Sequence, residues 1–203
     1  MDRIKNTIAN LERNGFTVRY FEKAEDAVTS LISEIDKSET VGFGGSVTVD
    51  GLQIYEKLQE KGSPVFWHWK TAPDQNKALI MAQAATANVY LSSANAITED
   101  GRLLNIDGHG NRLSSMLYGH KRLYVVAGVN KIAASLDEAF IRVKNIAAPM
   151  NAKRLDLDTP CRHLGKCMNC DSPQRICKAT LIFDRQPKGV KVIIYLINEN
   201  LGY

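Results

Sequence analysis

The sequence contains no apolar run approaching the ~20 residues that a transmembrane helix requires. Its N-terminal stretch has neither a signal-peptide core nor a small-residue cleavage site. Charge of one sign is also scarce, because 26 Lys and Arg against 22 Asp and Glu leave a net charge of only +4, and no basic stripe carries interleaved aromatic side chains. We therefore expect a cytoplasmic protein whose partners include neither a membrane nor a nucleic acid.

Cysteine is rare as well, and its four copies share one segment. In a cytoplasmic chain such a cluster indicates metal binding or redox chemistry before disulfides. The central Cys-x-x-Cys spacing lets two sulfurs from one turn bind the same ion. The segment is poor in large apolar residues, so we expect one metal centre, zinc or an iron–sulfur cluster, to order residues 158–178. A redox disulfide without metal is the alternative. The predicted ligands are Cys161, Cys167, Cys170 and Cys177.

Strands and helices alternate along the rest of the chain. Helical spacing of apolar residues predicts helices over 2–13, 24–35, 49–59, 74–87 and 135–147, the last ended by Pro149. Apolar and β-branched runs predict strands over 16–21, 40–43, 64–67, 88–92, 123–128, 179–183 and 190–197, with a hairpin joining 94–98 to 103–106. This order predicts the α/β class: a mostly parallel open sheet with helices on both faces. We expect one domain over residues 1–203, with 158–178 as a cysteine loop within it.

A glycine turn follows the second predicted strand and precedes a helix. Glycine lets the backbone turn sharply and lets N–H groups approach a ligand closely. A helix N-terminus favours anions, and ligands of open α/β sheets gather at the carboxyl ends of strands. We therefore predict that Gly44, Gly45 and Ser46 bind a carboxylate or phosphate. The alternative is a tight turn that binds nothing.

A second group of candidates lies between positions 93 and 112. The glycines around His109 permit a tight backbone that presents neighbouring side chains together. His109 is a candidate general base, and Glu99 is another where it is desolvated. Arg112 is a candidate clamp for a carboxylate. The alternatives are a plain hairpin turn around Glu99 and a histidine that bonds loop carbonyls. The remaining ligand-binding candidates are Asn95, Asp107 and Asn111.

These motifs together resemble the landmarks of the lactate-utilization (LUD-domain) family. The resemblance rests on residues 42–46, 94–101 and 105–112, and on the cysteine pattern followed by residues 197–203. It covers essentially the whole chain. The family implies a fold similar to that of sugar-phosphate isomerases, coenzyme A transferases and formyltetrahydrofolate cyclo-ligase, with the ligand over the carboxyl ends of parallel strands.

Three functions are compatible with this resemblance. The first is an accessory protein of lactate oxidation that binds a small carboxylate or phosphorylated ligand. The second is an isomerase- or ligase-type enzyme, although no catalytic Glu or Lys of the isomerases or transferases matches by motif. The third is a subunit that docks iron–sulfur partner proteins through the cysteine loop. The residues leave open whether the chain catalyses a reaction.

Overall fold

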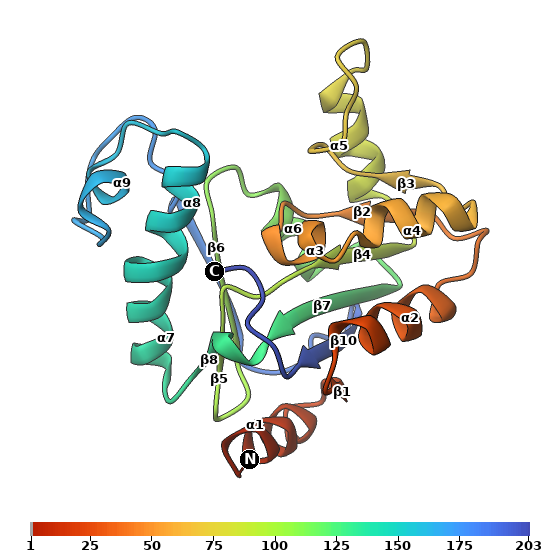
Figure 1. Cartoon of the computed structure of the whole chain (residues 1–203), viewed down its shortest axis with the longest axis horizontal. Coiled ribbons are helices and arrows are strands. Elements are labelled where there is room, and N and C mark those ends of the chain that lie inside the picture. The colour runs from red at the N-terminus through yellow and green to blue at the C-terminus, as the bar shows by residue number, and fades with distance from the viewer. Residues whose placement is uncertain (1) are drawn as a thin grey trace.

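The computed structural model describes residues 2–203, and Figure 1 traces them from end to end. The helices are α1 (Asp2–Arg13), α2 (Ala24–Glu34), α3 (Val47–Gly51), α4 (Ile54–Lys61), α5 (Lys77–Ala85), α6 (Asn111–Leu117), the 3-10 turn η1 (Val129–Lys131), α7 (Leu136–Arg142), the π-helical turn η2 (Val143–Ala147), α8 (Ala148–Arg154) and α9 (Pro160–Leu164). The strands are β1 (Thr17–Phe21), β2 (Val41–Phe43), β3 (Val65–Phe66), β4 (Val89–Ser92), β5 (Ala96–Thr98), β6 (Leu103–Asp107), β7 (Arg122–Gly128), β8 (Ile132–Ala133), β9 (Ala179–Phe183) and β10 (Lys191–Ile197). Within the described range, no helix is both long and apolar enough to cross a membrane.

Six parallel strands form the main sheet, in the order β1-β10-β7-β4-β2-β3. The central strands β7 and β10 are almost continuous apolar runs, because side chains on both of their faces are buried. Tyr124 and Tyr195 face one side and Val125 and Ile194 the other, and all four are fully buried. The predicted α/β class with a parallel sheet is confirmed.

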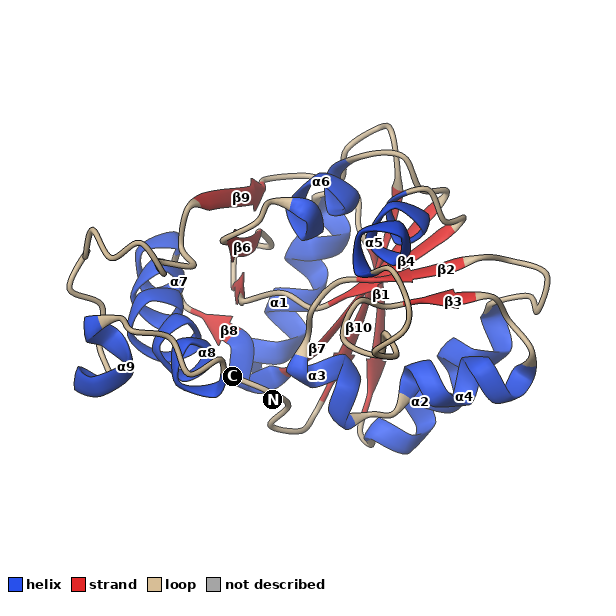
Figure 2. Cartoon of the chain, turned by 90° about the horizontal axis from the view of Figure 1, so that it is seen from above, coloured by secondary structure: helices blue, strands red, loops and turns tan. Residues whose placement is uncertain are grey.

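Helices cover both faces of this sheet (Figure 2). One face packs against the apolar stripes of α2, α3 and α4, through residues such as Leu31, Val49 and Leu58. The other packs against α1 and α6, through Leu11 and Met116. Two hydrophobic cores thus hold the parallel strands from opposite sides. The loops that connect strands and helices lie at the ends of the strands.

A second, smaller sheet accompanies the main one, in the order β8-β5-β6-β9. Its hairpin, β5 with β6, is antiparallel as predicted, whereas β5 pairs with β8 in parallel. Ile97 and Leu103 pack toward the main sheet, and Ala96 and Leu104 pack toward α7 and η2. Figure 1 shows α7 and α8 on the outer side of this sheet. The sequence indicated the hairpin but not the second sheet, because β8 has only two residues.

Two predicted helices differ in the structure. The helix expected over 49–59 is divided into α3 and α4 by Gln53, which has a left-handed φ of 54°. Pro149 does not end the helix before it, but lies in the first turn of α8, where its missing N–H is tolerated. The preceding π-helical turn shifts the hydrogen bonding, with Ala148 N donating to Val143 O, so α7 continues into α8.

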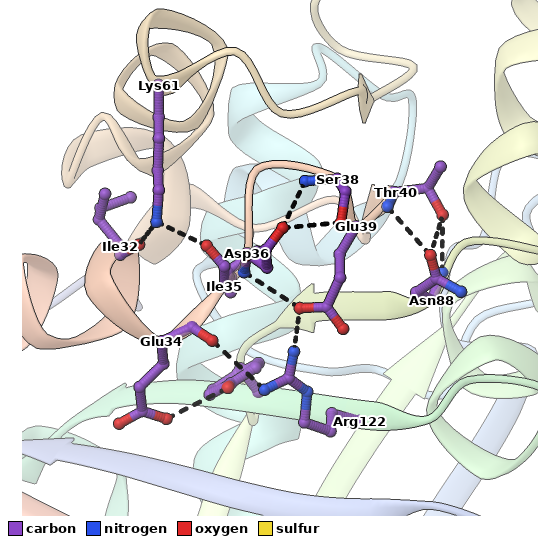
Figure 3. Close-up of polar contacts among 11 residues, drawn as sticks. Ile32, Glu34, Ile35, Asp36, Ser38, Glu39, Thr40, Lys61, Asn88 and Arg122 are labelled. Carbon is purple, nitrogen blue, oxygen red and sulfur yellow. Dashed lines mark hydrogen bonds and ion pairs between the residues drawn. The ribbon is translucent and has the colours of Figure 1, made fainter.

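Polar contacts tie the amino ends of the central strands together (Figure 3). Arg122, which begins β7, pairs with Glu39 in the turn before β2. Asn88, just before β4, accepts hydrogen bonds from the backbone N (3.2 Å) and Oγ1 (3.1 Å) of Thr40. Lys61 donates to the carbonyls that end α2 and so links α4 to α2. At this end of the sheet, the polar side chains bind one another and neighbouring backbone groups.

Candidate functional site

A cavity of about 490 Å³ lies at the opposite, carboxyl end of the sheet. Its walls include Gly45 and Ser46 after β2, Ser93 after β4, and Lys131 after β7. The loop between β6 and α6, helix α8 and the end of the cysteine segment complete it. The volume falls in the range of small-molecule sites, and the position is where open α/β sheets bind ligands.

Arg112 joins the separate stretches that the sequence singled out. Its Nη1 donates to Gly45 O at 3.3 Å, and its Nη2 donates to Asn95 Oδ1 at 3.3 Å and to Ile106 O at 2.5 Å. The guanidinium therefore bridges the glycine turn, the segment after β4 and the end of β6. The structure thus brings the loops near positions 44 and 109 together around one hollow.

The two glycines of the turn are required by close packing. A Cβ on Gly44 would lie 2.9 Å from Arg112 Cγ and from Ser92 Oγ. A Cβ on Gly45 would lie 2.9 Å from Trp69 Cζ2. Gly45 lines the cavity, whereas Gly44 lies behind Arg112 and lets that side chain approach β2. The turn therefore makes room for two walls of the cavity.

The small polar candidates mainly hold the loops in place. Ser46 Oγ accepts a 3.2 Å hydrogen bond from Val49 N and caps α3. Asn95 Oδ1 accepts from Ile106 N at 2.9 Å. Asp107 Oδ1 accepts from the backbone N of His109 at 2.9 Å and closes a tight turn before α6. These three side chains line the cavity, so each combines a backbone contact with access to a ligand, and Asn111 lines the cavity as well.

The two candidate bases lie in different places. His109 is exposed and lines the cavity. Glu99 does not line it, because the β5–β6 turn points toward α1, where Asn10 Nδ2 donates to Glu99 O at 2.6 Å. Its carboxylate accepts a 2.6 Å charged hydrogen bond from Arg3 and is one-third exposed. The structure therefore places Glu99 in a hairpin turn, outside the candidate site.

Lys131 is a cavity residue that the sequence analysis did not identify. It lies in η1, directly after the central strand β7, and only 4% of its surface is exposed. Its Nζ donates to Thr48 Oγ1 and Ser93 Oγ, both at 2.8 Å. Burial, followed by the nearby charges of Arg142 and Arg112, lowers the pKa of Lys131 to about 7. The signal in the sequence is a single lysine three residues after the end of a continuous apolar strand.

The cavity is strongly basic. Asp107 is the one carboxylate among the described side chains that line it, and its Oδ2 lies 3.6 Å from Arg112 Nε. Burial and the charge of Lys77 lower the pKa of the neighbouring His68. The arrangement favours an anion, because several cations face one paired carboxylate. The basic side chains lining the cavity are Lys77, Arg112, Lys131, Arg154, Arg175 and Lys178.

One wall of the cavity is aromatic. Trp69 lines it and stacks on the buried Trp67 with ring centroids 5.4 Å apart. Arg154 lies over the Trp69 ring at 4.4 Å from its centroid. Because Trp67 stacks in turn on Phe43 of β2, the wall is anchored in the core. A ligand here meets an aromatic surface held rigidly beside cationic groups.

The cysteine segment forms another wall. Lys178 N donates to Asp107 O at 3.0 Å, and Arg175 and Ile176 line the cavity. All four cysteines are free and partly exposed. Arg175 Nε donates to Cys177 Sγ at 3.2 Å. Across residues 2–203, no three His, Cys, Asp or Glu side chains are grouped as metal ligands, so the thiols as arranged do not fit the predicted centre.

The comparisons with known proteins agree with this architecture. The family model of the LUD domain matches residues 4–197, so the chain belongs to the LUD domain family. Among solved structures, it is similar to a DUF162 family protein from Deinococcus radiodurans, with a TM-score of 0.54 and 10% sequence identity over 98% of this chain and 97% of that one. At this identity the similarity shows the fold alone. No curated protein matches the sequence.

Proposed function

We propose that this chain binds a small anionic metabolite in the cavity at the carboxyl end of its parallel sheet, as an accessory protein of lactate utilization. The observation that carries the proposal is the excess of cations around the cavity, with Asp107 already paired to Arg112. The family supports the connection with lactate. Lactate, its oxidation product pyruvate and phosphorylated compounds are the ligand classes that such a site favours.

Different cations have different tasks in this proposal. Arg112 is held by three oxygen acceptors and shapes the site. Lys77 and Lys178 are exposed at the rim and attract the anion. Trp69 excludes water on one side, so that electrostatic contacts inside the cavity are stronger than at the open surface. The His109 ring stays available as a proton donor or acceptor for a bound ligand.

Calorimetric titration at low salt tests the proposal. The probes are lactate, pyruvate, inorganic phosphate and a nucleotide, each titrated into the full chain. Lys77→Met should weaken binding by up to about fivefold, because a partly solvated charge contact contributes about 0.2–1 kcal/mol. The matched control is Lys37→Met, an exposed lysine outside the cavity. Absence of binding heat with all four probes would contradict the proposal.

A metal centre at the four cysteines is a separate proposal. Its support is the cysteine spacing and the position of Arg175, which donates from Nε to Cys177 Sγ at 3.2 Å and from Nη1 to Cys170 O at 2.8 Å. Metal binding would require the four thiols to converge further. Elemental analysis of protein purified without air should find about one zinc or up to four irons per chain. Metal-free protein that resists proteolysis within 158–178 would contradict it.

The docking of iron–sulfur partner proteins is the alternative role for this segment. It carries the exposed basic residues Lys166 and Lys178. Co-purification from cells that express the neighbouring genes, with and without residues 158–178, distinguishes this role. Retention of the same partners after deletion would exclude the segment as the docking surface.

A further inference from the structure

The Lys131 side chain is buried at the cavity and has no acidic partner among the described residues. Its Nζ contacts two hydroxyls, and within residues 2–203 these are its hydrogen-bond partners. A buried lysine is normally paired with a carboxylate, because a charged ammonium is costly to desolvate. Besides burial, the groups that lower its pKa are the cations Arg142 and Arg112. The site therefore opposes the charged form of the amine.

The hydrogen-bond directions also suit a neutral amine. Thr48 Oγ1 donates its proton to Leu201 O at 3.3 Å, and Ser93 Oγ donates to Ala94 O at 3.3 Å. Both hydroxyl oxygens therefore accept from Lys131, and they use two N–H groups. A neutral amine has two such hydrogens and one lone pair, whereas an ammonium has a third N–H. Within the described residues that third hydrogen would have no acceptor, while the lone pair of the neutral form stays free.

We propose that Lys131 is a nucleophile that forms an imine with the carbonyl carbon of an anionic oxo compound bound in the cavity. This inference deepens the proposed function, since it rests on anion binding at the same site. The anionic group is held by the cavity cations, and the carbonyl carbon lies at the buried amine. The lowered pKa of Lys131 supports the assignment, because a neutral amine is the reactive form.

The step balances without an oxidant or reductant. The Nζ lone pair forms a bond to the carbonyl carbon, and the carbonyl π electrons move to oxygen, which takes one of the two Nζ protons. The resulting carbinolamine loses its hydroxyl group as water, with a second proton supplied by solvent in the cavity. One amine, one carbonyl and one proton thus give a protonated imine and water.

The ligand class is a carbonyl compound with a carboxylate or phosphate one or two bonds from the carbonyl. Two sources share this chemistry: 2-oxo acids and phosphorylated ketones. Pyruvate represents the first and dihydroxyacetone phosphate the second. Lactate has the same carbon skeleton as pyruvate but a hydroxyl in place of the carbonyl, so it binds as an anion and forms no imine.

Reductive trapping tests the assignment on the intact wild-type chain. The protein is incubated with pyruvate, dihydroxyacetone phosphate or lactate, and sodium cyanoborohydride then reduces any imine to a stable amine. With pyruvate we expect a mass increase equal to pyruvic acid less one oxygen atom, and peptide mapping should place it on Lys131. Lactate should give no increase. The more reactive of the two oxo compounds identifies the source.

The pH dependence of trapping separates Lys131 from ordinary lysines. Its rate should reach half of its maximum near pH 7, whereas an exposed lysine requires a pH near 10. The charged groups that lower the pKa of Nζ are Arg142 from α7 and Arg112 from α6. Lys131→Met should abolish trapping at pH 7, and Lys37→Met should leave it unchanged.

Two results would overturn the inference. One is modification at another lysine, and the other is no trapping with either oxo compound. Binding heat with pyruvate but no trapped product would reject the imine and leave the anion site in place. Absence of both heat and trapping would reject the imine and the proposed function together.

Discussion

The two ends of the parallel sheet handle charge in opposite ways. At the amino end, Arg122 pairs with Glu39 and bonds the carbonyl of Glu34, and Lys61 ends on the carbonyls of α2 (Figure 3). At the carboxyl end, the cavity cations outnumber the one carboxylate, and Lys131 contacts only hydroxyls in the described chain. Paired charges link neighbouring elements, whereas unpaired cations create a positive electrostatic potential that attracts an anionic ligand. Under the proposed function, the amino end serves stability alone, whereas the carboxyl end serves both stability and ligand binding.

Arg112→Ala should have the largest effect. It removes the side-chain donor to the carbonyls of Gly45 and Ile106 and the cation beside Asp107, while Asn95 Oδ1 keeps its bond from Ile106 N. We expect the free energy of unfolding to fall by about 3 kcal/mol, because unsatisfied buried groups cost about 1–3 kcal/mol each and partly relax. Urea denaturation measures it. Arg102→Ala, which removes a partly exposed pair with Asp100, is the control and should cost under about 1 kcal/mol.

Lys131→Met should change how stability depends on pH. In the wild type the folded-state pKa is about 7, below the value of about 10.4 in the unfolded chain. Between these values the unfolded state binds more protons, so the free energy of unfolding rises with pH. From pH 7 to 9 we expect a rise of about 2 kcal/mol in the wild type relative to the variant. If the free energies of unfolding of the two proteins change with pH in the same way, the pKa of Lys131 is not lowered in the folded state.

Arg122→Ala tests whether a charge at the amino end affects stability without affecting ligand binding. Its guanidinium pairs with Glu39 and lies 5.7 Å from the centroid of the Tyr124 ring. Loss of these contacts should lower the free energy of unfolding by about 1–2 kcal/mol. Ligand heats should remain as in the wild type, because the residue begins β7 and the cavity lies beyond its end. Weakened binding in a folded variant would break the division between the two ends.

Glu99→Gln should have the smallest effect. The carboxylate pairs with Arg3 at the partly exposed hairpin turn, and such pairs contribute less than about 1 kcal/mol. Binding heats and Lys131 trapping should not change. A large loss of either binding heat or trapping would show that Glu99 acts in the site, and this would require the β5–β6 turn to move.

The regular elements were largely predictable from local pattern. The apolar run of β7 and the alternation around the β5–β6 turn each specify a strand with little dependence on distant residues. The prediction that Pro149 ends the helix is wrong, because a proline can begin a helical turn as well as end one, and the π-helical turn before it connects α7 to α8. The strand β8 has only two residues, which is too short for an alternating pattern that would predict a strand.

The candidate site was predictable in part. Glycines followed by a helix, and an Asp, His, Asn and Arg on one short loop, pointed to the two stretches that Arg112 joins. Lys131 was missed because its meaning depends on Thr48 and Ser93, which lie far from it in the chain. Glu99 was included because a carboxylate looks the same in sequence whether its turn faces a cavity or a helix.

The sequence by itself determined the α/β class, the parallel strands and the loops that follow them, since hydrophobic periodicity and glycine act locally. Only the tertiary structure decided which charges meet. A charge derives its chemistry from burial and from partners within a few ångströms, and these come from strand order in the sheet. The same lysine after β7 would be an ordinary surface cation if β2 and β4 did not bring Thr48 and Ser93 beside it.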